Sequence, residues 1–154
     1  MILRVYLDTS VIGGCFDQEF LPWSMKLFAE LRNKKKIAVI SDLTFRELNN
    51  APQRVRELLN ELPKTALEIV QFDIKAEKLA HAYIQNKAAH LKHIVDAQHI
   101  AIATVSEVDV LVSWNFKQIV NLNKIHMFNS VNLKLGYPML EIRSPREVFN
   151  EEEI

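Results

Sequence analysis

The chain of 154 residues has few residues that break or cross-link a fold, with only 3 glycines, 5 prolines and a single cysteine. So little glycine and proline argues against a disordered or fibrous protein. Cys15 has no second cysteine with which to form an internal disulfide. The apolar run at residues 1–5 is interrupted by Arg4 and is too short for a signal sequence or a membrane span. We therefore expect a soluble cytoplasmic protein with no membrane partner.

The chain also has no excess of charge of either sign. Lysine and arginine number 19, aspartate and glutamate number 19, and the formal net charge at pH 7 is +0. No global positive field is present to attract a polyanion, so nucleic-acid binding would need a local patch or a bound metal. Because 49% of the residues are hydrophobic, the chain can bury a sizeable core, and we expect one domain over residues 1–154.

Apolar runs alternate with helical patterns along the chain. Apolar, β-branched or aromatic runs predict buried strands at 3–7, 37–40, 67–72, 108–113 and 140–142. The first of these runs is ended by residues 8–10 and by the flexible pair Gly13-Gly14. Helices are expected from residue 22 to the basic run 34–36, over a short segment capped by Ser41 or Asp42, and over 52–62, 74–87, 94–105 and 123–135. This alternation predicts an α/β fold, a three-layer α/β/α sandwich with a mostly parallel central sheet.

Four polar residues stand where such a fold collects its ligands. Asp8, Glu47 and Asn115 follow predicted strands, and Asp96 lies near the start of an apolar helix. In open α/β sheets ligands bind beyond the carboxyl ends of the strands, so one pocket could hold all four side chains. Two carboxylates about 4 Å apart repel by roughly 4 kcal/mol at an effective dielectric constant near 20. The pattern therefore predicts an acidic pocket for a hard divalent cation, Mg²⁺ or Mn²⁺.

Each of these residues also has a simpler explanation. Asp8 and Asp96 could cap helices, Glu47 could be a solvated helix residue, and Asn115 could cap the segment that follows it. Asp8 comes directly after a buried strand, however, and Asp96 lies among apolar helix residues, where an unpaired charge is costly. Taken together, the four positions favour the metal site.

The segments around these positions resemble the four acidic-site motifs of PIN-domain ribonucleases in order and spacing. They are LDTSVI at 7–12, SDLTFREL at 41–48, VDAQHIA at 95–101 and LVSWNF at 111–116. Among these ribonucleases the chain is most similar to the VapC-like toxins of VapBC-type toxin–antitoxin modules, whose last turn resembles IRSPRE at 142–147. The likeness spans essentially the whole chain.

This resemblance implies a metal-dependent endoribonuclease in which Asp8, Glu47 and Asp96 surround Mg²⁺ or Mn²⁺. Ser10 would be the small hydroxyl residue beside the first acid. Asn115 departs from the pattern, because many members have aspartate there and an amide offers a carbonyl oxygen but no charge. The alternative is a catalytically weak or inactive PIN-like protein that binds RNA or regulates. The resemblance alone implies a homodimer and a small antitoxin that covers the cleft.

Other side chains near these motifs are candidates for substrate contacts. Arg46 adjoins Glu47 and Lys117 follows Asn115, so both are candidates for holding a phosphate. Trp114 is a candidate for stacking on a nucleobase, with a place in the core as the alternative.

Three histidines, His90, His93 and His99, recur with Asp96 at every third position. Steps of three residues drift by about 60° each around a helix, so the four side chains cannot share one metal. We expect solvated or hydrogen-bonded histidines, with His93 and His99 as alternatives for touching phosphate or orienting Asp96.

Two other enzyme classes with a similar layout fit the sequence poorly. A phosphatase of the Asp-x-Asp kind needs a second acid where this chain has Ser10. A receiver domain needs a phosphorylatable aspartate at the end of the third strand, and Asp73 falls beyond that strand as an expected helix cap.

Overall fold

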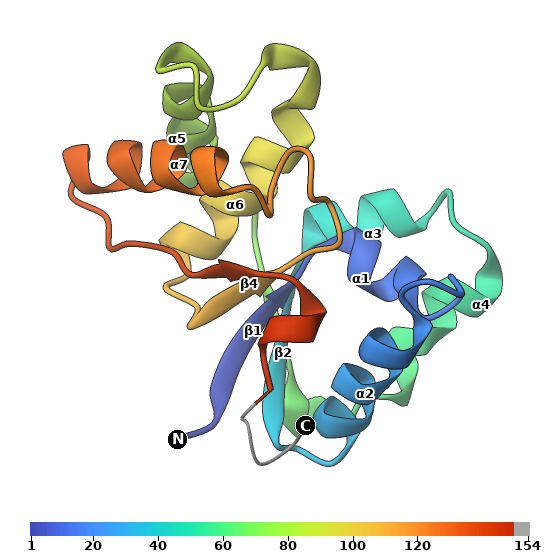
Figure 1. Cartoon of the computed structure of the whole chain (residues 1–154). Helices are drawn as coiled ribbons and strands as arrows, with labels where there is room; N and C mark the ends of the chain where they lie inside the picture. The colour runs from blue at the N-terminus through green and yellow to red at the C-terminus, as the bar shows by residue number, and fades with distance from the viewer. Residues whose placement is uncertain (150–154) are drawn as a thin grey trace.

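The structure is a computed structural model and describes residues 1–149, so the acidic run at 151–153 lies outside the described residues. Its centre is a five-stranded sheet with the order β3-β2-β1-β4-β5. The strands are β1 (Leu3–Leu7), β2 (Lys36–Ser41), β3 (Leu67–Val70), β4 (Val110–Val112) and β5 (Ile142–Arg143). All four neighbouring pairs are parallel. The predicted sheet is thereby confirmed (Figure 1).

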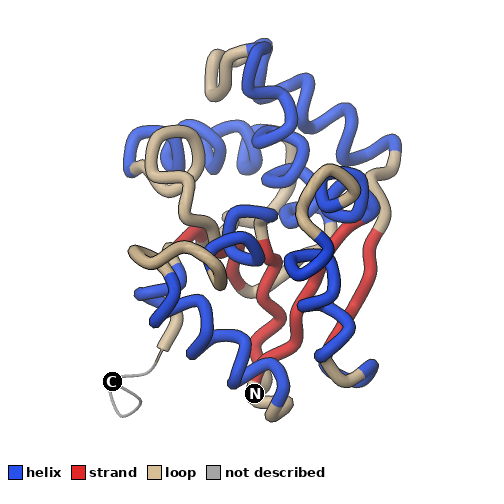
Figure 2. The backbone as a smooth tube through the Cα atoms, turned by 90° about the vertical axis from the view of Figure 1, so that its right-hand side faces the viewer, coloured by secondary structure: helices blue, strands red, loops and turns tan. Residues whose placement is uncertain are grey.

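Helices cover both faces of the sheet (Figures 1 and 2). The α-helices are α1 (Thr9–Gly14), α2 (Leu21–Arg32), α3 (Asp42–Leu48), α4 (Gln53–Arg56), α5 (Ile74–Gln85), α6 (Ile94–Val105) and α7 (Leu122–Lys134). Single 3-10 turns lie at η1 (Glu57–Glu61), η2 (Lys64–Ala66), η3 (Leu91–His93) and η4 (Pro145–Glu147). No helix within residues 1–149 has the length and apolar character needed to cross a bilayer.

Alternation along β1 divides the core into two layers. Tyr6 packs with residues of α5, α6 and α7, whereas its neighbours Val5 and Leu7 pack with α1, α2 and α4. Successive strand side chains point to opposite faces, so one strand contributes to both layers. The three-layer α/β/α arrangement is therefore confirmed.

The structure corrects the sequence prediction at the first turn after β1. The pair Gly13-Gly14 predicted a flexible turn, but both glycines belong to helix α1. A Cβ atom on Gly14 would lie 2.7 Å from both Ser24 Oγ and Trp114 Nε1, whereas one on Gly13 would meet nothing within 4 Å. Gly14 is therefore needed for close packing of α1 against α2 and the segment after β4, and not for chain flexibility.

Several element boundaries differ from the prediction. The strand expected over 67–72 ends at Val70, and the strand expected over 140–142 is Ile142–Arg143. The helix expected over 52–62 is a four-residue helix, α4, followed by the 3-10 turn η1. The strand expected over 108–113 is shorter, because β4 covers Val110–Val112. These differences leave the carboxyl ends of β1, β2 and β4 side by side, since β1 pairs with both of the others.

Candidate functional site

Asp8 lies directly after β1 and begins helix α1. Its side chain makes no capping hydrogen bond to that helix, although its backbone occupies the N-cap position. Instead, Asp8 Oδ2 accepts hydrogen bonds from Ser10 Oγ at 2.7 Å and from Ser113 Oγ at 2.8 Å. Ser10 Oγ in turn accepts the Trp114 N–H at 3.0 Å. Two hydroxyl groups and the segment after β4 therefore fix the orientation of a buried carboxylate.

Glu47 reaches the same region from helix α3, which follows β2. Its Oε1 accepts a hydrogen bond from Thr9 Oγ1 at 2.8 Å and is also hydrogen-bonded to His99 Nε2. Burial acts to raise the pKa of Glu47, but the hydrogen bond and charge of His99, with the Thr9 hydroxyl, outweigh it and lower the pKa. Glu47 is thus held as a carboxylate.

His99 connects Glu47 to Asp8 and to the core. Only 1% of the His99 side chain is exposed, and its Nε2 lies 3.9 Å from Asp8 Oδ1. Burial acts to lower the pKa of His99, but the hydrogen bond that His99 donates to Glu47 and the negative charges of Asp8, Glu47 and Asp96 raise it. A raised pKa favours the imidazolium form, which offsets part of the surrounding negative charge.

Tyr6 anchors the other side of the His99 ring. Tyr6 Oη lies 2.7 Å from His99 Nδ1 and 2.8 Å from Ser41 Oγ. Tyr6 is fully buried, and burial raises the pKa of its phenol despite the neighbouring hydroxyls of Ser41 and Thr44. One buried chain of hydrogen bonds therefore runs from Ser41 through Tyr6 and His99 to Glu47.

Asp96 lies in the first turn of α6 and is the most weakly held of the three acids. Its Oδ2 accepts a hydrogen bond from Asn115 Nδ2 at 3.5 Å and lies 3.9 Å from His93 Nδ1. Burial and then the negative charge of Asp8 raise the pKa of Asp96 to about 6, with a further contribution from Glu47, against the charge of His99 and the Asn115 bond. The raised pKa is evidence that the three carboxylates share one region.

Asn115 does not present its carbonyl oxygen to the acids. Its Oδ1 accepts the backbone N–H of Gln118 at 2.9 Å, and its amide nitrogen faces Asp96. The Gln118 N–H requires an acceptor, so the hydrogen-bond network fixes this orientation. In this arrangement the carbonyl oxygen of Asn115 is directed to Gln118, so Asp8, Glu47 and Asp96 are the stronger candidates for metal ligands, and a contact between Asn115 and a metal stays a prediction.

The geometry of these three acids fits a hydrated cation better than an all-protein cage. Within residues 1–149, no group of three or more histidine, cysteine, aspartate or glutamate side chains is close enough together to form a ready-made metal site. Over the same residues, Glu47 Oε2 and Asp96 Oδ1 accept no hydrogen bond and remain available as ligands. Mg²⁺ commonly binds through one or two carboxylates and keeps several waters. The donor set therefore suits Mg²⁺ or Mn²⁺ held partly through water.

Trp114 belongs to the core and is not available to a nucleobase. Only 6% of it is exposed, its ring stacks on Phe20 with centroids 4.3 Å apart, and its Nε1 donates to Ser24 Oγ at 2.8 Å. The alternative of a stacking platform is therefore wrong. Phe116, which is 48% exposed and packs edge-on against Trp114, is the accessible aromatic ring in this segment.

Arg46 and Lys117 are both exposed, on α3 and in the loop after β4. A cavity of about 400 Å³ lies beside the acids on the α1 side. It is lined by Ser10, Gly13, Gly14, Asp17, Phe20, Trp114 and Asn115.

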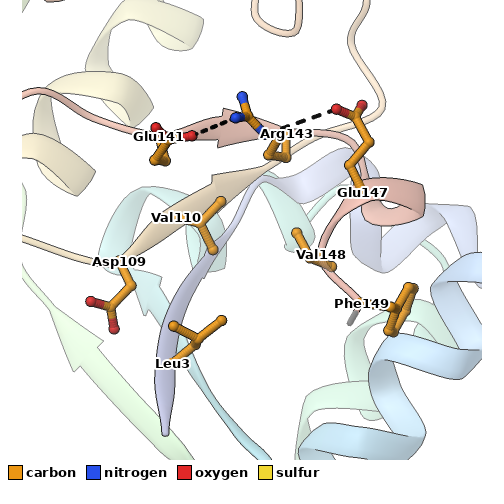
Figure 3. A pocket seen from close by; sticks show the side chains of 8 residues that line it. All are labelled: Leu3, Asp109, Val110, Glu141, Arg143, Glu147, Val148 and Phe149. Atoms are coloured by element: carbon orange, nitrogen blue, oxygen red, sulfur yellow. Dashed lines mark ion pairs between the residues drawn. The ribbon is translucent and has the colours of Figure 1, made fainter. Parts of the chain in front are cut away.

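A different cavity, of about 220 Å³, lies near the amino-terminal ends of β1 and β4, away from these acids (Figure 3). Its charged groups are already paired. Arg143 Nη2 lies 2.8 Å from Glu141 Oε2, and Arg143 Nε lies 4.0 Å from Glu147 Oε2. Asp109 Oδ2 accepts a hydrogen bond from the backbone N–H of Arg4 at 2.8 Å. These pairings make the cavity a poor site for a cation.

No protein-family model matches the sequence, and no curated protein is similar enough to count as a match. Solved structures do match over almost the whole chain. FitAcB from Neisseria gonorrhoeae has a TM-score of 0.58 and 14% identity, with 94% of this chain and 99% of that chain covered.

Two further structures give similar values. VapBC2 from Rickettsia felis, bound to a DNA fragment from their promoter, has a TM-score of 0.55 and 15% identity, covering 92% of this chain and 98% of that one. VapC20 from Mycobacterium tuberculosis, a Sarcin-Ricin loop cleaving toxin, has a TM-score of 0.55 and 12% identity, covering 88% and 98%. The chain therefore has the fold of the VapC-like PIN-domain toxins, as its sequence motifs predicted.

Proposed function

We propose that the protein is a metal-dependent endoribonuclease of the toxin type, which hydrolyses phosphodiester bonds in RNA. The proposal rests on the convergence around His99 of Asp8 after β1, Glu47 on the helix after β2 and Asp96 in the first turn of α6. Asp8 and Glu47 each help raise the pKa of Asp96 to about 6. A cation would offset this mutual repulsion, and strongly perturbed acids in one region are typical of functional sites.

Each acid has a role supported by its contacts. Asp8, Glu47 and Asp96 would hold Mg²⁺ or Mn²⁺, which lowers the pKa of a bound water and neutralises charge on phosphoryl oxygens. Ser10 and Ser113 orient the Asp8 carboxylate. The outcome is attack of water on phosphorus and cleavage of the bond to the 3′ oxygen, which leaves a 5′-phosphate and a 3′-hydroxyl.

His99 and Asn115 act on the acids and not on the substrate. His99 is held by Tyr6 and restricts the Glu47 carboxylate to one orientation, while the Asn115 amide restrains Asp96. Supporting side chains of this kind keep metal ligands in place, and their loss commonly lowers activity or affinity by about 10- to 100-fold.

The toxin role rests on the neighbours in structure. VapBC2 and FitAcB support a small antitoxin as partner for this chain, and VapC20 is a Sarcin-Ricin loop cleaving toxin. We extend the same proposal to a homodimer and to an antitoxin that covers the acidic cleft.

The second candidate function is a weakly active or inactive PIN-like protein that binds RNA. The Asn115 side chain favours it, because this residue contributes no charge and its carbonyl oxygen is occupied by Gln118. RNA cleavage measured with Mn²⁺ and with EDTA separates the two functions. The enzyme cleaves only with Mn²⁺ and loses at least about 100-fold of its rate in Asp8→Asn and Asp96→Asn. Undetectable cleavage by the wild-type protein would support the second function, and unchanged cleavage in either variant would refute the site assignment.

A further inference from the structure

A group of basic side chains adjoins the acids on the side of α6 and α7. We call it the basic surface, and it consists of Lys87, His90, Lys92, His93, Lys117 and Lys124. The basic surface is in contact with the acidic site, because His93 Nδ1 lies 3.9 Å from Asp96 Oδ2. Lys117 comes two residues after Asn115, whose amide is bonded to the same carboxylate oxygen.

These basic side chains come from adjoining segments of the chain. Lys92 and His93 lie in the turn η3, and the backbone N–H of Lys92 donates to His90 Nδ1 at 3.2 Å. His90 in turn lines one cavity together with Lys87 and with Lys124 from the first turn of α7. In a chain of zero net charge, this is a local positive field beside the acidic site.

The basic surface contains a cavity of about 470 Å³, within the range of small-ligand pockets. Its lining combines cationic and apolar groups: Ile84, Lys87, Ala89, His90, Leu91 and Lys124. Lys124 Nζ donates to the backbone carbonyl of Ala88 at 3.3 Å, which holds its charge at the cavity. His90 lies three residues before His93 across the turn η3, a rise of about 6 Å along a 3-10 helix.

The opposite flank of the acids has a different character. The cavity on the α1 side is lined by Asp17 and aromatic residues and has no lysine, arginine or histidine in its lining. A phosphodiester chain that passes the acids therefore meets positive charge on the α6 and α7 side and negative charge on the α1 side.

We propose that the basic surface binds one flank of a single-stranded RNA substrate and that the cavity at Lys87, Leu91 and Lys124 receives one nucleotide of that flank. This inference rests on the proposed ribonuclease function and names how its substrate is held. Lys87 and Lys124 contact phosphates, and Ile84 and Leu91 provide the apolar wall for the base. Single strands suit such a cavity because their bases are free to leave the stack, whereas duplex bases are paired inside.

RNA binding in the absence of cleavage tests the proposal. The probe is a short labelled single-stranded RNA, titrated by fluorescence anisotropy against Asp96→Asn protein in EDTA at several salt concentrations. Each phosphate contact to a single strand contributes about 0.7 to the slope of log affinity against log salt. In Lys87→Gln/Lys124→Gln we expect the slope to fall by about 1.4 and the affinity to fall about tenfold at about 0.1 M salt.

The chain offers a matched control in Lys34→Gln/Lys35→Gln. Lys34 and Lys35 are exposed just before β2, at the end of the sheet opposite to the acids. Lys34 and Lys87 both have a positive φ, 60° and 61°, so the two double variants change the backbone preference similarly. The control keeps the wild-type slope, and an equal slope change in both pairs would overturn the proposal.

Leu91→Ser tests the nucleotide cavity separately from the charges. Leu91 is 64% exposed, so its replacement leaves the core intact. The proposal predicts weaker RNA binding with an unchanged salt slope, and it is overturned if Leu91→Ser binds like the parent protein. Tighter binding of duplex DNA of the same length than of the RNA overturns it as well.

The outcome for catalysis is read from a different experiment. Wild-type protein that binds RNA with these slopes but never cleaves it would refute the ribonuclease and leave the binding surface standing. Protein that cleaves RNA but binds equally well with and without Lys87 and Lys124 would refute the binding surface and leave the ribonuclease standing.

Discussion

His99 Nε2 is hydrogen-bonded to Glu47 Oε1, which joins two residues 52 positions apart in the sequence. The contact links helix α6 to helix α3 across the carboxyl end of the sheet. Because Tyr6 holds the opposite nitrogen of the His99 ring, the position of an acid on α3 depends on a tyrosine near the carboxyl end of β1.

Tyr6→Phe should therefore impair the site as well as the fold. Loss of the phenol leaves His99 Nδ1 without its partner, and unsatisfied buried groups cost about 1–3 kcal/mol of unfolding free energy. We expect RNA cleavage to fall by about 10- to 100-fold. The measurements are steady-state cleavage and urea unfolding.

Tyr83→Phe is the matched control for this variant. Tyr83 is also fully buried and hydrogen-bonded, to Asn132, but it lies on α5 away from the acids. It should lose stability while keeping its cleavage rate per folded molecule. If Tyr6→Phe cleaves RNA as fast as Tyr83→Phe, the hydrogen bond between Tyr6 and His99 does not help to orient Glu47.

Asp96→Asn should stabilise the metal-free protein at neutral pH. The folded-state pKa of Asp96, about 6, is above its unfolded value of 3.8, so the folded state binds more protons between these values. Stability from this residue is therefore fully present below about pH 4 and is lost as the pH rises through 6. The unfolding free energy of Asp96→Asn relative to that of the wild-type protein should increase by up to about 3 kcal/mol from acidic to neutral pH. Urea unfolding of both proteins in EDTA across this range checks the sign, and a gain independent of pH would contradict the raised pKa.

Mn²⁺ should raise the melting temperature of the wild-type protein. A ligand that binds only the folded state at 100 times its dissociation constant stabilises it by about 2.7 kcal/mol. We expect this increase to vanish in Asp8→Asn and Glu47→Gln. Calorimetric titration with Mn²⁺ alone measures the affinity without RNA, and equal binding by the wild-type and variant proteins would place the metal elsewhere.

Asn115→Asp should make the fold more dependent on metal. A fourth carboxylate beside Asp96 adds repulsion in the empty site and removes the amide hydrogen bond. Melting temperatures with and without Mn²⁺ should differ by more in this variant than in the wild-type protein. A smaller or equal difference would show that position 115 does not face the cation.

Gly14→Ala should destabilise the segment that carries Ser10 and Trp114. Its new methyl group would lie 2.7 Å from Ser24 Oγ and Trp114 Nε1, and overpacking of this kind costs typically about 1–3 kcal/mol. Gly13→Ala, one residue earlier in the same helix, meets open space and should be neutral or stabilising by up to about 1 kcal/mol. Thermal unfolding of the pair distinguishes close packing from chain flexibility.

Much of the fold could be predicted because its signals are local. The apolar runs of β1 and β2 and the Asp73-capped helix α5 follow from residue patterns within a few positions. Helix α1 was not predicted, because two adjacent glycines ordinarily end regular structure. The need for glycine at position 14 comes from its packing against Trp114, which is 100 positions away in the sequence.

The positions of the candidate acids also followed from topology, since carboxyl ends of parallel strands share one edge of the sheet. The contacts that orient these acids could not be predicted. Tyr6 and His99 are 93 positions apart, and a tyrosine in an apolar strand gives no sign of a hydrogen-bonded role. Ser113 Oγ donates to Asp8 Oδ2 across 105 positions, and no pattern near either residue indicates this contact. The apolar surroundings that bury Trp114 are likewise assembled only in the folded chain.

We propose that Asp8, Glu47 and Asp96 together hold the cation with which the protein hydrolyses RNA. The most direct measurement is cleavage of a labelled RNA by wild-type and Asp96→Asn protein, with Mn²⁺ and with EDTA, followed by analysis of the product ends. We expect 5′-phosphate and 3′-hydroxyl ends from the wild-type protein with Mn²⁺ only, and a loss of at least about 100-fold of the cleavage rate in Asp96→Asn. Cleavage that persists in EDTA, or that leaves a 2′,3′-cyclic phosphate, would contradict it.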